Sequence, residues 1–209
     1  MIRVLVVDDH AVVRRGVRQI LADASDLTVA GEAATGEEAL RALREGPWDV
    51  VLLDLSLADR SGFDLLKQIK AAYPGLAVLV LTMHAEEQYA LRVLRAGASG
   101  YLTKESAPDL LVSAIRKVAR GGKYLSPSLA EVLASRLGDD YERAPHEILS
   151  DREFQVLCLM AAGKGLTEIA RELIVSVKTV STHRARILQK MHLKNNAELI
   201  AYALRHKLI

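Results

Sequence analysis

The sequence predicts an α/β fold with a five-stranded, doubly wound parallel sheet, followed by a C-terminal all-α domain of four helices. Five short apolar segments alternate with amphipathic segments up to about residue 120, and no strand pattern follows Ser150. The Val and Leu residues of these segments run continuously, as in a parallel sheet that helices cover on both faces. The expected strands are Arg3–Val7, Thr28–Ala33, Val50–Leu53, Ala77–Leu81 and Gly100–Leu102.

The segments between these strands have the apolar spacing of helices, and most end at a recognisable stop signal. Gly46-Pro47 ends the second helix, Pro74-Gly75 follows the third and Gly97 closes the fourth. In such a sheet the ligand site lies outside the carboxyl ends of the strands, where the strand order reverses. The expected helices are Ala11–Ala24, Gly36–Glu45, Ser61–Ala72, Glu86–Ala96 and Ala107–Arg120.

The rest of the chain is expected to form a linker and a separate helical domain. Gly121-Gly122 breaks the alternating pattern, and Ser126-Pro127 has the pattern of an N-cap with proline at the first helical position. This start predicts a short helix to about Arg136, before a polar, turn-rich hinge at 138–145. We therefore expect a domain at 1–122, a linker at 123–147 and a helical domain at 148–209. The helices expected in this last domain are Asp151–Ala162, Thr167–Leu173, Val177–Met191 and Asn196–Lys207.

The composition favours a globular protein of the cytoplasm with a basic C-terminal part. Half of the residues are hydrophobic and 26% are charged. The longest apolar runs are far shorter than the roughly 20 residues of a membrane helix, and no secretion signal precedes the first strand, so we expect no membrane association. The single cysteine, Cys158, allows no internal disulfide and is expected to pack inside a helix. Residues 148–209 have a net charge of +5 and the remainder −3, so the basic part could face a polyanion.

Five polar residues stand at the carboxyl ends of the expected strands. Asp8 and Asp9 close the first strand, Asp54 the third and Thr82 the fourth, and Lys104 follows the fifth. Three clustered carboxylates raise each other's pKa unless a cation lies among them, and Mg²⁺ with its oxygen ligands meets that need. A lysine and a hydroxyl complete the groups needed for phosphoryl transfer. Any one of these residues alone is an ordinary polar residue at a strand end, but together and in this order they predict a phosphoryl-transfer site.

Residues 1–122 resemble the receiver domain of two-component response regulators, which has a flavodoxin-like fold. The resemblance implies that Asp54 accepts a phosphoryl group from a phosphohistidine of a sensor histidine kinase, or from a small phosphodonor. It also implies that Thr82 and Lys104 bind the phosphoryl oxygens, and that Thr82 and Tyr101 form a switch pair in which Tyr101 rotates inward. The motifs that carry the resemblance are Val6–His10, Leu52–Asp54, Val80–Thr82 and Gly100–Lys104.

The same resemblance implies a Mg²⁺ site. The ion would be held by Asp9, Asp54 and the carbonyl oxygen of Ser56, with Asp8 acting mainly through water. Ser56 and His84 stand at positions that tune the lifetime of the phosphorylated state in this family.

The loop after Asp54 departs from the family pattern. The family commonly has Met-Pro at the third and fourth positions after the phosphoacceptor, whereas this chain has Leu57-Ala58, although Gly62 is retained. Losing the proline removes a restraint on φ and frees an N–H group. We therefore expect a more mobile loop and a changed phosphorylation lifetime, with every chemical group still present.

The C-terminal helices have the pattern of a helix-turn-helix. Leu149–Glu153 reads as a capped helix start, because a Ser hydroxyl stands before a Glu three residues on. In the helix at Val177–Met191, the apolar residues Val180, Ile187 and Leu188 can face a core while cationic and hydroxyl side chains face outward, as in a helix that enters a major groove. The residues alone also allow a helical bundle with a solvated basic face.

This segment resembles the LuxR-type helix-turn-helix of the NarL/FixJ group of response regulators, including the Thr-Val-x-x-His pattern at Thr179–His183. The resemblance implies double-stranded DNA as a partner. The family frequently has lysine at the position of Ser181, so Arg184 or Arg186 would supply that charge here. The last helix offers Leu199, Ile200 and Ala203 either for pairing two such domains or for packing within one. The expected DNA-contacting residues are Lys178, Thr179, Ser181, Thr182, Arg184, Arg186 and Lys190.

Together these features predict a phosphorylation-controlled, sequence-specific transcription regulator that is not an enzyme and that forms a homodimer when phosphorylated. RNA polymerase is a further candidate partner. One alternative is a regulator that binds DNA constitutively and uses the receiver as a dimer scaffold. Another is an aspartate-nucleophile phosphatase, but such enzymes generally need a second Asp two residues after the nucleophile, and Ser56 stands there.

Overall fold

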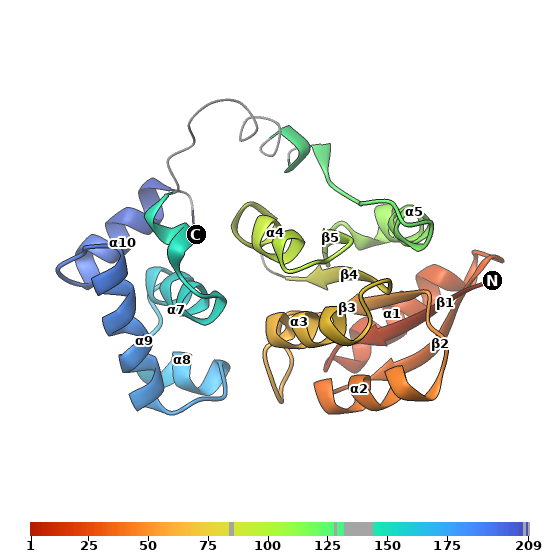
Figure 1. Ribbon diagram of the computed structural model, residues 1–209, viewed down its shortest axis with the longest axis horizontal. Coiled ribbons are helices and arrows are strands. Elements are labelled where there is room, and N and C mark those ends of the chain that lie inside the picture. Colours follow the sequence, from red (N-terminus) through yellow and green to blue (C-terminus); the bar gives the residue numbers. More distant parts are fainter. Residues whose placement is uncertain (84–85, 128, 132–143, 207, 209) are drawn as a thin grey trace. The chain divides into compact units, whose positions relative to one another are not determined.

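The chain folds into two compact units, Met1–Ala130 and Glu131–Ile209. The computed structural model describes residues 1–83, 86–127, 129–131, 144–206 and 208. The sheet and its helices belong to the first unit, and a bundle of helices forms the second (Figure 1). Within the described parts of the chain, no helix combines the length and the apolar character needed to cross a membrane.

The first unit contains the predicted five-stranded parallel sheet. Its strand order is β2-β1-β3-β4-β5, so the order reverses between β1 and β3. All residues of β3 and β4 are buried, as expected for strands covered on both faces. The strands are β1 (Ile2–Val7), β2 (Leu27–Ala33), β3 (Val50–Leu53), β4 (Ala77–Thr82) and β5 (Gly100–Thr103), each within one residue of its predicted bounds.

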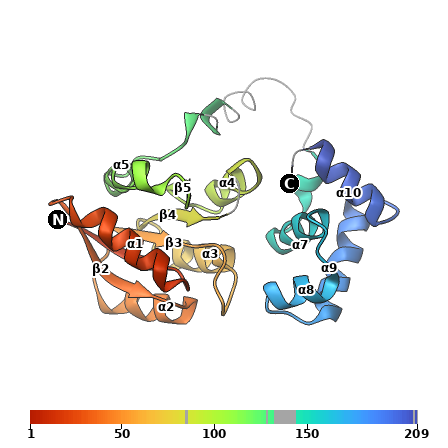
Figure 2. The same ribbon diagram turned by 180° about the vertical axis from the view of Figure 1, so that it is seen from behind.

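Helices cover both faces of the sheet, which makes three layers. The helices are α1 (Ala11–Ala22), α2 (Gly36–Glu45), α3 (Gly62–Ala72), α4 (Glu86–Arg95) and α5 (Ala107–Ala119). One face is covered by α1 and α5, whose Val17, Leu21 and Ile115 pack on alternate strand residues such as Val6. The other face is covered by α2, α3 and α4 (Figures 1 and 2), and there the rings of Phe63 and Tyr89 lie 5.9 Å apart. The fold predicted from the sequence is confirmed.

The segment after α5 packs along the edge of β5. The Tyr124 N–H donates to the Ser99 carbonyl (2.9 Å), and residue 124 forms a parallel bridge with Gly100. A Cβ at Gly100 would lie 2.8 Å from Cβ of Tyr124, so this approach needs glycine. The short helix predicted from Ser126 begins as expected, because the Leu129 N–H donates to the Ser126 hydroxyl (3.1 Å). Its continuation and most of the predicted hinge lie outside the described residues.

In the part of the second unit that the structure describes, the chain forms a 3₁₀ turn at Pro145–Ile148 and four helices. The helices are α7 (Asp151–Ala161), α8 (Leu166–Glu172), α9 (Val177–Lys190) and α10 (Asn196–Arg205). The capping box predicted at Ser150 and Glu153 is present. Cys158 is buried, as predicted. Leu199 and Ala203 are fully buried in the core of this unit, so of the alternatives left open by the sequence the structure favours packing within one domain for these two.

Candidate phosphoryl-transfer and DNA-binding sites

The register of the strands brings the predicted acidic residues together at one edge of the sheet. Val7 pairs with Leu53 across β1 and β3, so Asp8 and Asp54 leave neighbouring strands side by side. The Asp54 N–H donates to the Val7 carbonyl (2.9 Å). On the other side of β3, the Lys104 N–H donates to the Thr82 carbonyl (2.8 Å). The backbone of the sheet therefore fixes the spacing of the predicted site residues.

Two of the carboxylates are buried and share one cation. Asp8 and Asp54 are each 2% exposed. The Lys104 ammonium lies 2.7 Å from Oδ2 of Asp8 and 2.7 Å from Oδ2 of Asp54. Burial acts to lower the pKa of Lys104, but its bonds to Asp54 and Asp8 outweigh burial and raise that pKa. Lys104 is therefore a permanent positive charge in the pocket.

The Thr82 hydroxyl is buried at the end of β4, the strand that neighbours β3. Thr82 is 0% exposed, and its Oγ1 has no hydrogen-bond partner among the described residues. A buried, unpaired hydroxyl is destabilising, and a phosphoryl oxygen would satisfy it. Tyr101, its predicted switch partner, lies on the neighbouring strand and is 1% exposed. Its side chain thus already lies inside the unit.

Asp9 and His10 extend the cluster of polar side chains around Asp8 and Asp54. His10 Nδ1 lies 2.7 Å from Oδ1 of Asp9 and 3.3 Å from Oδ1 of Asp8. Oxygen or nitrogen atoms of Asp8, Asp9, His10 and Asp54 all lie within 4.8 Å of one another, the spacing of a metal-binding group. His10 was not among the residues predicted for this site, although its place directly after the acid pair was a signal that could have found it.

The loop after Asp54 is packed at both ends. The N–H of Ser56 donates to Asp54 Oδ1 (3.2 Å), and the N–H of Gly62 donates to the Leu55 carbonyl (3.0 Å). A Cβ at Gly62 would clash with the backbone of Asp54 and Leu55, so the retained glycine lets α3 begin against the strand end. Leu57 is only 5% exposed. His84, the other predicted tuning residue, lies outside the described residues.

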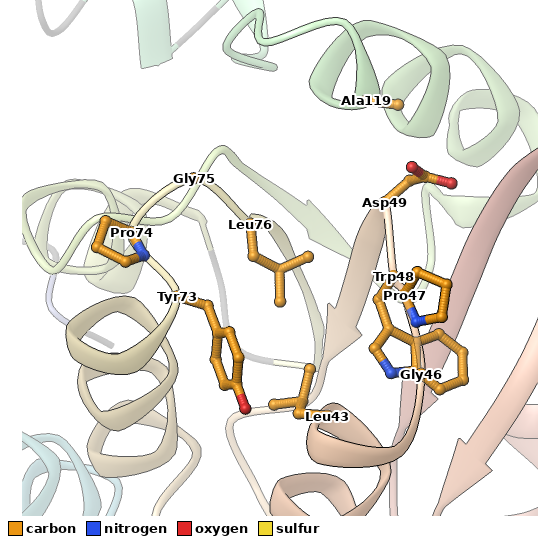
Figure 3. Close-up of a pocket in the computed structure, with 10 residues that line it drawn as sticks. All are labelled: Leu43, Gly46, Pro47, Trp48, Asp49, Tyr73, Pro74, Gly75, Leu76 and Ala119. Atoms are coloured by element: carbon orange, nitrogen blue, oxygen red, sulfur yellow. The ribbon is translucent and has the colours of Figure 1, made fainter.

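A separate pocket of about 510 Å³ opens at the opposite end of the sheet. Figure 3 shows Leu43, Trp48 and Tyr73 around it, close to the residues that lead into β3 and β4. None of the residues predicted for phosphoryl transfer lines it. The predicted chemistry is therefore confined to the carboxyl ends of the strands.

In the second unit, α9 exposes a polar face. Its hydroxyl-capped start is present, because the Ser176 hydroxyl accepts from the Thr179 N–H (3.0 Å). Of the predicted residues, Lys178, Thr182 and Arg186 are exposed and four residues apart, so they share one side of the helix. Ala185 and Gln189 are exposed at the matching spacing and were not among the predicted residues. The helical period itself was the signal that could have found them.

The other predicted residues of α9 are half-buried and engaged within the unit. Arg184 Nε donates to Asn196 Oδ1 on α10 (2.6 Å), and the Lys190 ammonium pairs with Glu153 on α7 (2.7 Å). The Thr179 hydroxyl lies 2.8 Å from that of Ser176. Ser181 is half-buried beside the exposed face. Only part of the predicted set therefore projects freely from the helix.

Comparison with known proteins assigns each unit to a family. Residues 4–116 match the response regulator receiver domain, and residues 147–203 match the luxR family of bacterial regulatory proteins. The chain is 38% identical over 209 residues to the response regulator UvrY of Escherichia coli K12, covering 100% of this chain and 96% of UvrY. It is 41% identical over 214 residues to the oxygen regulatory protein NreC of Staphylococcus carnosus, covering 99% of each.

Solved structures agree with this assignment. RcsB of Salmonella enterica serovar Typhimurium, bound to the promoter rprA in the presence of the phosphomimetic BeF₃⁻, matches with a TM-score of 0.68 and 28% identity over 96% of this chain and 97% of RcsB. These families comprise regulators rather than a known class of enzyme. The chain therefore belongs to the two-component response regulators of the NarL/FixJ type, which join a receiver domain to a LuxR-type helix-turn-helix.

Proposed function

We propose that Asp54 is the phosphoacceptor of this response regulator and takes its phosphoryl group from a sensor histidine kinase. The observation that supports this most strongly is the buried ion cluster, in which Lys104 lies 2.7 Å from both Asp54 and Asp8. Lys104 and the Thr82 hydroxyl, which has no hydrogen-bond partner among the described residues, are the groups that would bind the oxygens of a phosphoryl group on Asp54. The domain boundaries that we propose are 1–122, 123–147 and 148–209. The receiver match (4–116) lies inside the first domain, and the luxR-family match (147–203) begins one residue before the third.

We also propose that this pocket holds Mg²⁺. The donors suit a hard cation, because Asp8, Asp9 and Asp54 supply carboxylate oxygens within 4.8 Å of one another. Asp9, Asp54 and the carbonyl of Ser56 would hold the ion, with Asp8 acting through water. A bound Mg²⁺ would neutralise charge that develops on the transferring phosphoryl group. Lys104 would then exchange its contact with Asp54 for the phosphoryl oxygens.

The C-terminal unit binds double-stranded DNA in this proposal, through the exposed face of α9. Lys178 and Arg186 supply charge for phosphates, while Thr182 with Ala185 and Gln189 faces base edges.

Phosphorylation of Asp54 would act through Thr82 and Tyr101 to favour a homodimer that reads two half-sites. RcsB, a structural relative, has been solved as two dimers bound to two parallel DNAs. RNA polymerase remains a candidate partner, and the cytoplasm is where we propose that the regulator acts.

The phosphoacceptor is tested by labelling with radioactive acetyl phosphate in the presence of Mg²⁺. We expect Asp54→Ala to abolish labelling, whereas Asp49→Ala, a change at an aspartate at the opposite end of the sheet, should keep it. Label that persists on the Asp54→Ala variant would refute the assignment.

The constitutive alternative makes a different prediction for the same protein. If the receiver were only a dimer scaffold, affinity for DNA would be equal with and without BeF₃⁻. We expect BeF₃⁻ to raise the affinity of the wild-type protein and to leave that of the Asp54→Ala variant unchanged. A phosphatase, the other alternative, would release phosphate from phosphomonoesters with turnover.

A further inference from the structure

The tip of the loop between β3 and α3 is tied to a neighbouring helix. The Asp59 carboxylate accepts hydrogen bonds from the backbone N–H groups of Gly36 (2.9 Å) and Glu37 (3.3 Å), the first two residues of α2. Arg60 Nε donates to the same carboxylate (3.2 Å). This loop carries Asp54 at its start, so the contact links the start of α2 to the proposed phosphoacceptor.

The start of α2 is shaped for this contact. The Thr35 hydroxyl caps the N–H of Glu38 (3.1 Å), so Thr35 and Asp59 divide the free N–H groups of the first turn between them. A Cβ at Gly36 would collide with the side chain of Arg60, with 2.7 Å to Nε. Only glycine at this position leaves room for Arg60 to lie over the start of the helix.

The Asp59 contact is charged and directional. Burial acts to raise the pKa of Asp59, but the N–H groups of Gly36 and Glu37, together with Arg60, outweigh it and lower that pKa. The carboxylate is therefore ionised at neutral pH and lies at the positive end of the α2 dipole. Charge-assisted hydrogen bonds of this kind are stronger than neutral ones, so they can hold a loop that has no proline.

We propose that Asp59 is a positioning residue for phosphoryl transfer: by fixing the tip of the loop to α2, it takes over the restraint that proline gives at position 58 in the family. This inference rests on the proposed function, because the loop matters only if Asp54 and the Ser56 carbonyl hold Mg²⁺. Leu57 is buried and the Leu55 carbonyl is hydrogen-bonded to Gly62, so with Asp59 the loop is held at its start, middle and tip.

The test is the Mg²⁺ dependence of phosphorylation by phosphoramidate. We expect Asp59→Ala to raise the Mg²⁺ concentration for half-maximal rate about fivefold, the factor that corresponds to loss of one helix-capping interaction, while the rate at saturating Mg²⁺ stays nearly the same. Direct titration with Mn²⁺, followed by the electron paramagnetic resonance of the free ion, should show weaker binding by the same factor. Asp59→Asn keeps one hydrogen-bond acceptor and is a milder variant. Its Mg²⁺ concentration for half-maximal rate should lie between those of the wild type and Asp59→Ala.

Two further variants separate positioning from general stability. Thr35→Ala removes the other cap of α2 without touching the loop, so we expect it to lower the melting temperature but leave the Mg²⁺ midpoint unchanged. Ala58→Pro in the Asp59→Ala background restores the family's proline and should return the midpoint to the wild-type value. An unchanged midpoint in Asp59→Ala, an equal shift in Thr35→Ala, or failure of Ala58→Pro to rescue would each overturn the inference.

Failure of the proposed function would look different. It would appear as a wild-type protein that phosphoramidate does not label, or as label that persists on Asp54→Ala. In either case Mn²⁺ binding still reports whether Asp59 shapes the pocket.

Discussion

The Lys190 ammonium lies 2.7 Å from Oε2 of Glu153, and this pair joins the last turn of α9 to the first turn of α7. Glu153 is 3% exposed, and the same Oε2 also accepts a hydrogen bond from the Ser150 N–H (2.8 Å). The pair therefore fixes α9 against the core of its unit. It also engages a lysine that the sequence marked as a DNA contact.

Both Lys190 and Lys178 belong to α9, but we expect Lys190 to contribute to the stability of the unit and Lys178 to the affinity for DNA. Lys190→Met leaves a buried carboxylate without its cation, so we expect a loss of about 1–2 kcal/mol of stability. Lys178→Met removes an exposed charge, so stability should hold while the slope of log affinity against log salt falls by about 0.9. Calorimetry and DNA binding at several salt concentrations measure the two effects. A reduced salt slope with unchanged melting in Lys190→Met would show that Lys190 contacts phosphate instead.

The same pair predicts the pH dependence of the C-terminal unit. Burial acts to raise the pKa of Glu153, but its bonds to Lys190 and Ser150 outweigh burial and hold the pKa below its usual value of 4.5. Because the pKa of Glu153 is lower in the folded unit, its carboxylate stabilises the fold fully above pH 4.5. This stabilisation disappears as the pH falls through the lowered pKa. Glu153→Gln should therefore be less stable than wild type at pH 7, and the difference should shrink below pH 4.5. Hydrogen exchange of peptides from α7 and α9 measures this, and a constant difference would contradict it.

Ile174 holds a conformation that its side chain disfavours. Its φ is +54°, in the left-handed region, and its side chain is 51% exposed at the turn between α8 and α9. A β-branched residue there costs roughly 1–2 kcal/mol. We expect Ile174→Asn to raise the free energy of unfolding by about 1 kcal/mol, measured by urea denaturation. Val177→Asn is the matched control: Val177 is also exposed (43%) but helical, so that variant should gain nothing.

Thr82→Val should separate stability from signalling. The variant keeps the shape of a side chain whose buried hydroxyl has no partner in the part of the chain that the structure describes. We therefore expect the free energy of unfolding of the unphosphorylated protein to rise by about 1 kcal/mol. The response of DNA affinity to BeF₃⁻ should be lost at the same time. Thr103 pairs with Thr82 across the sheet, but its hydroxyl lies 3.0 Å from that of Ser106. Thr103→Val should therefore be less stable than wild type, and a stable Thr103→Val with a destabilised Thr82→Val would contradict this reasoning.

Sequence reasoning worked best where local patterns decide the structure. Continuous apolar runs located the strands, and Ser150, Ser126 and Gly97 marked helix ends, because caps and strand burial depend on neighbouring residues alone. It was weaker for side chains whose residue type is compatible with two different environments. Leu199 was left open between pairing two domains and packing within one, because an apolar residue suits both. Lys190 was predicted only as a DNA contact, whereas it pairs with Glu153.

The sequence by itself determined which polar residues follow the carboxyl end of each strand. It therefore determined which side chains would lie at the same end of the sheet. Only the tertiary structure decided which atoms meet there. Lys104 lies between Asp8 and Asp54, the Thr82 hydroxyl has no partner within the described ranges, and Tyr101 is buried. The loop shows the same division. The sequence showed that its proline is absent, but the hydrogen bond from the Gly36 N–H to Asp59 joins residues 23 positions apart. Such contacts depend on how separate segments pack, and local propensity carries no information about that packing.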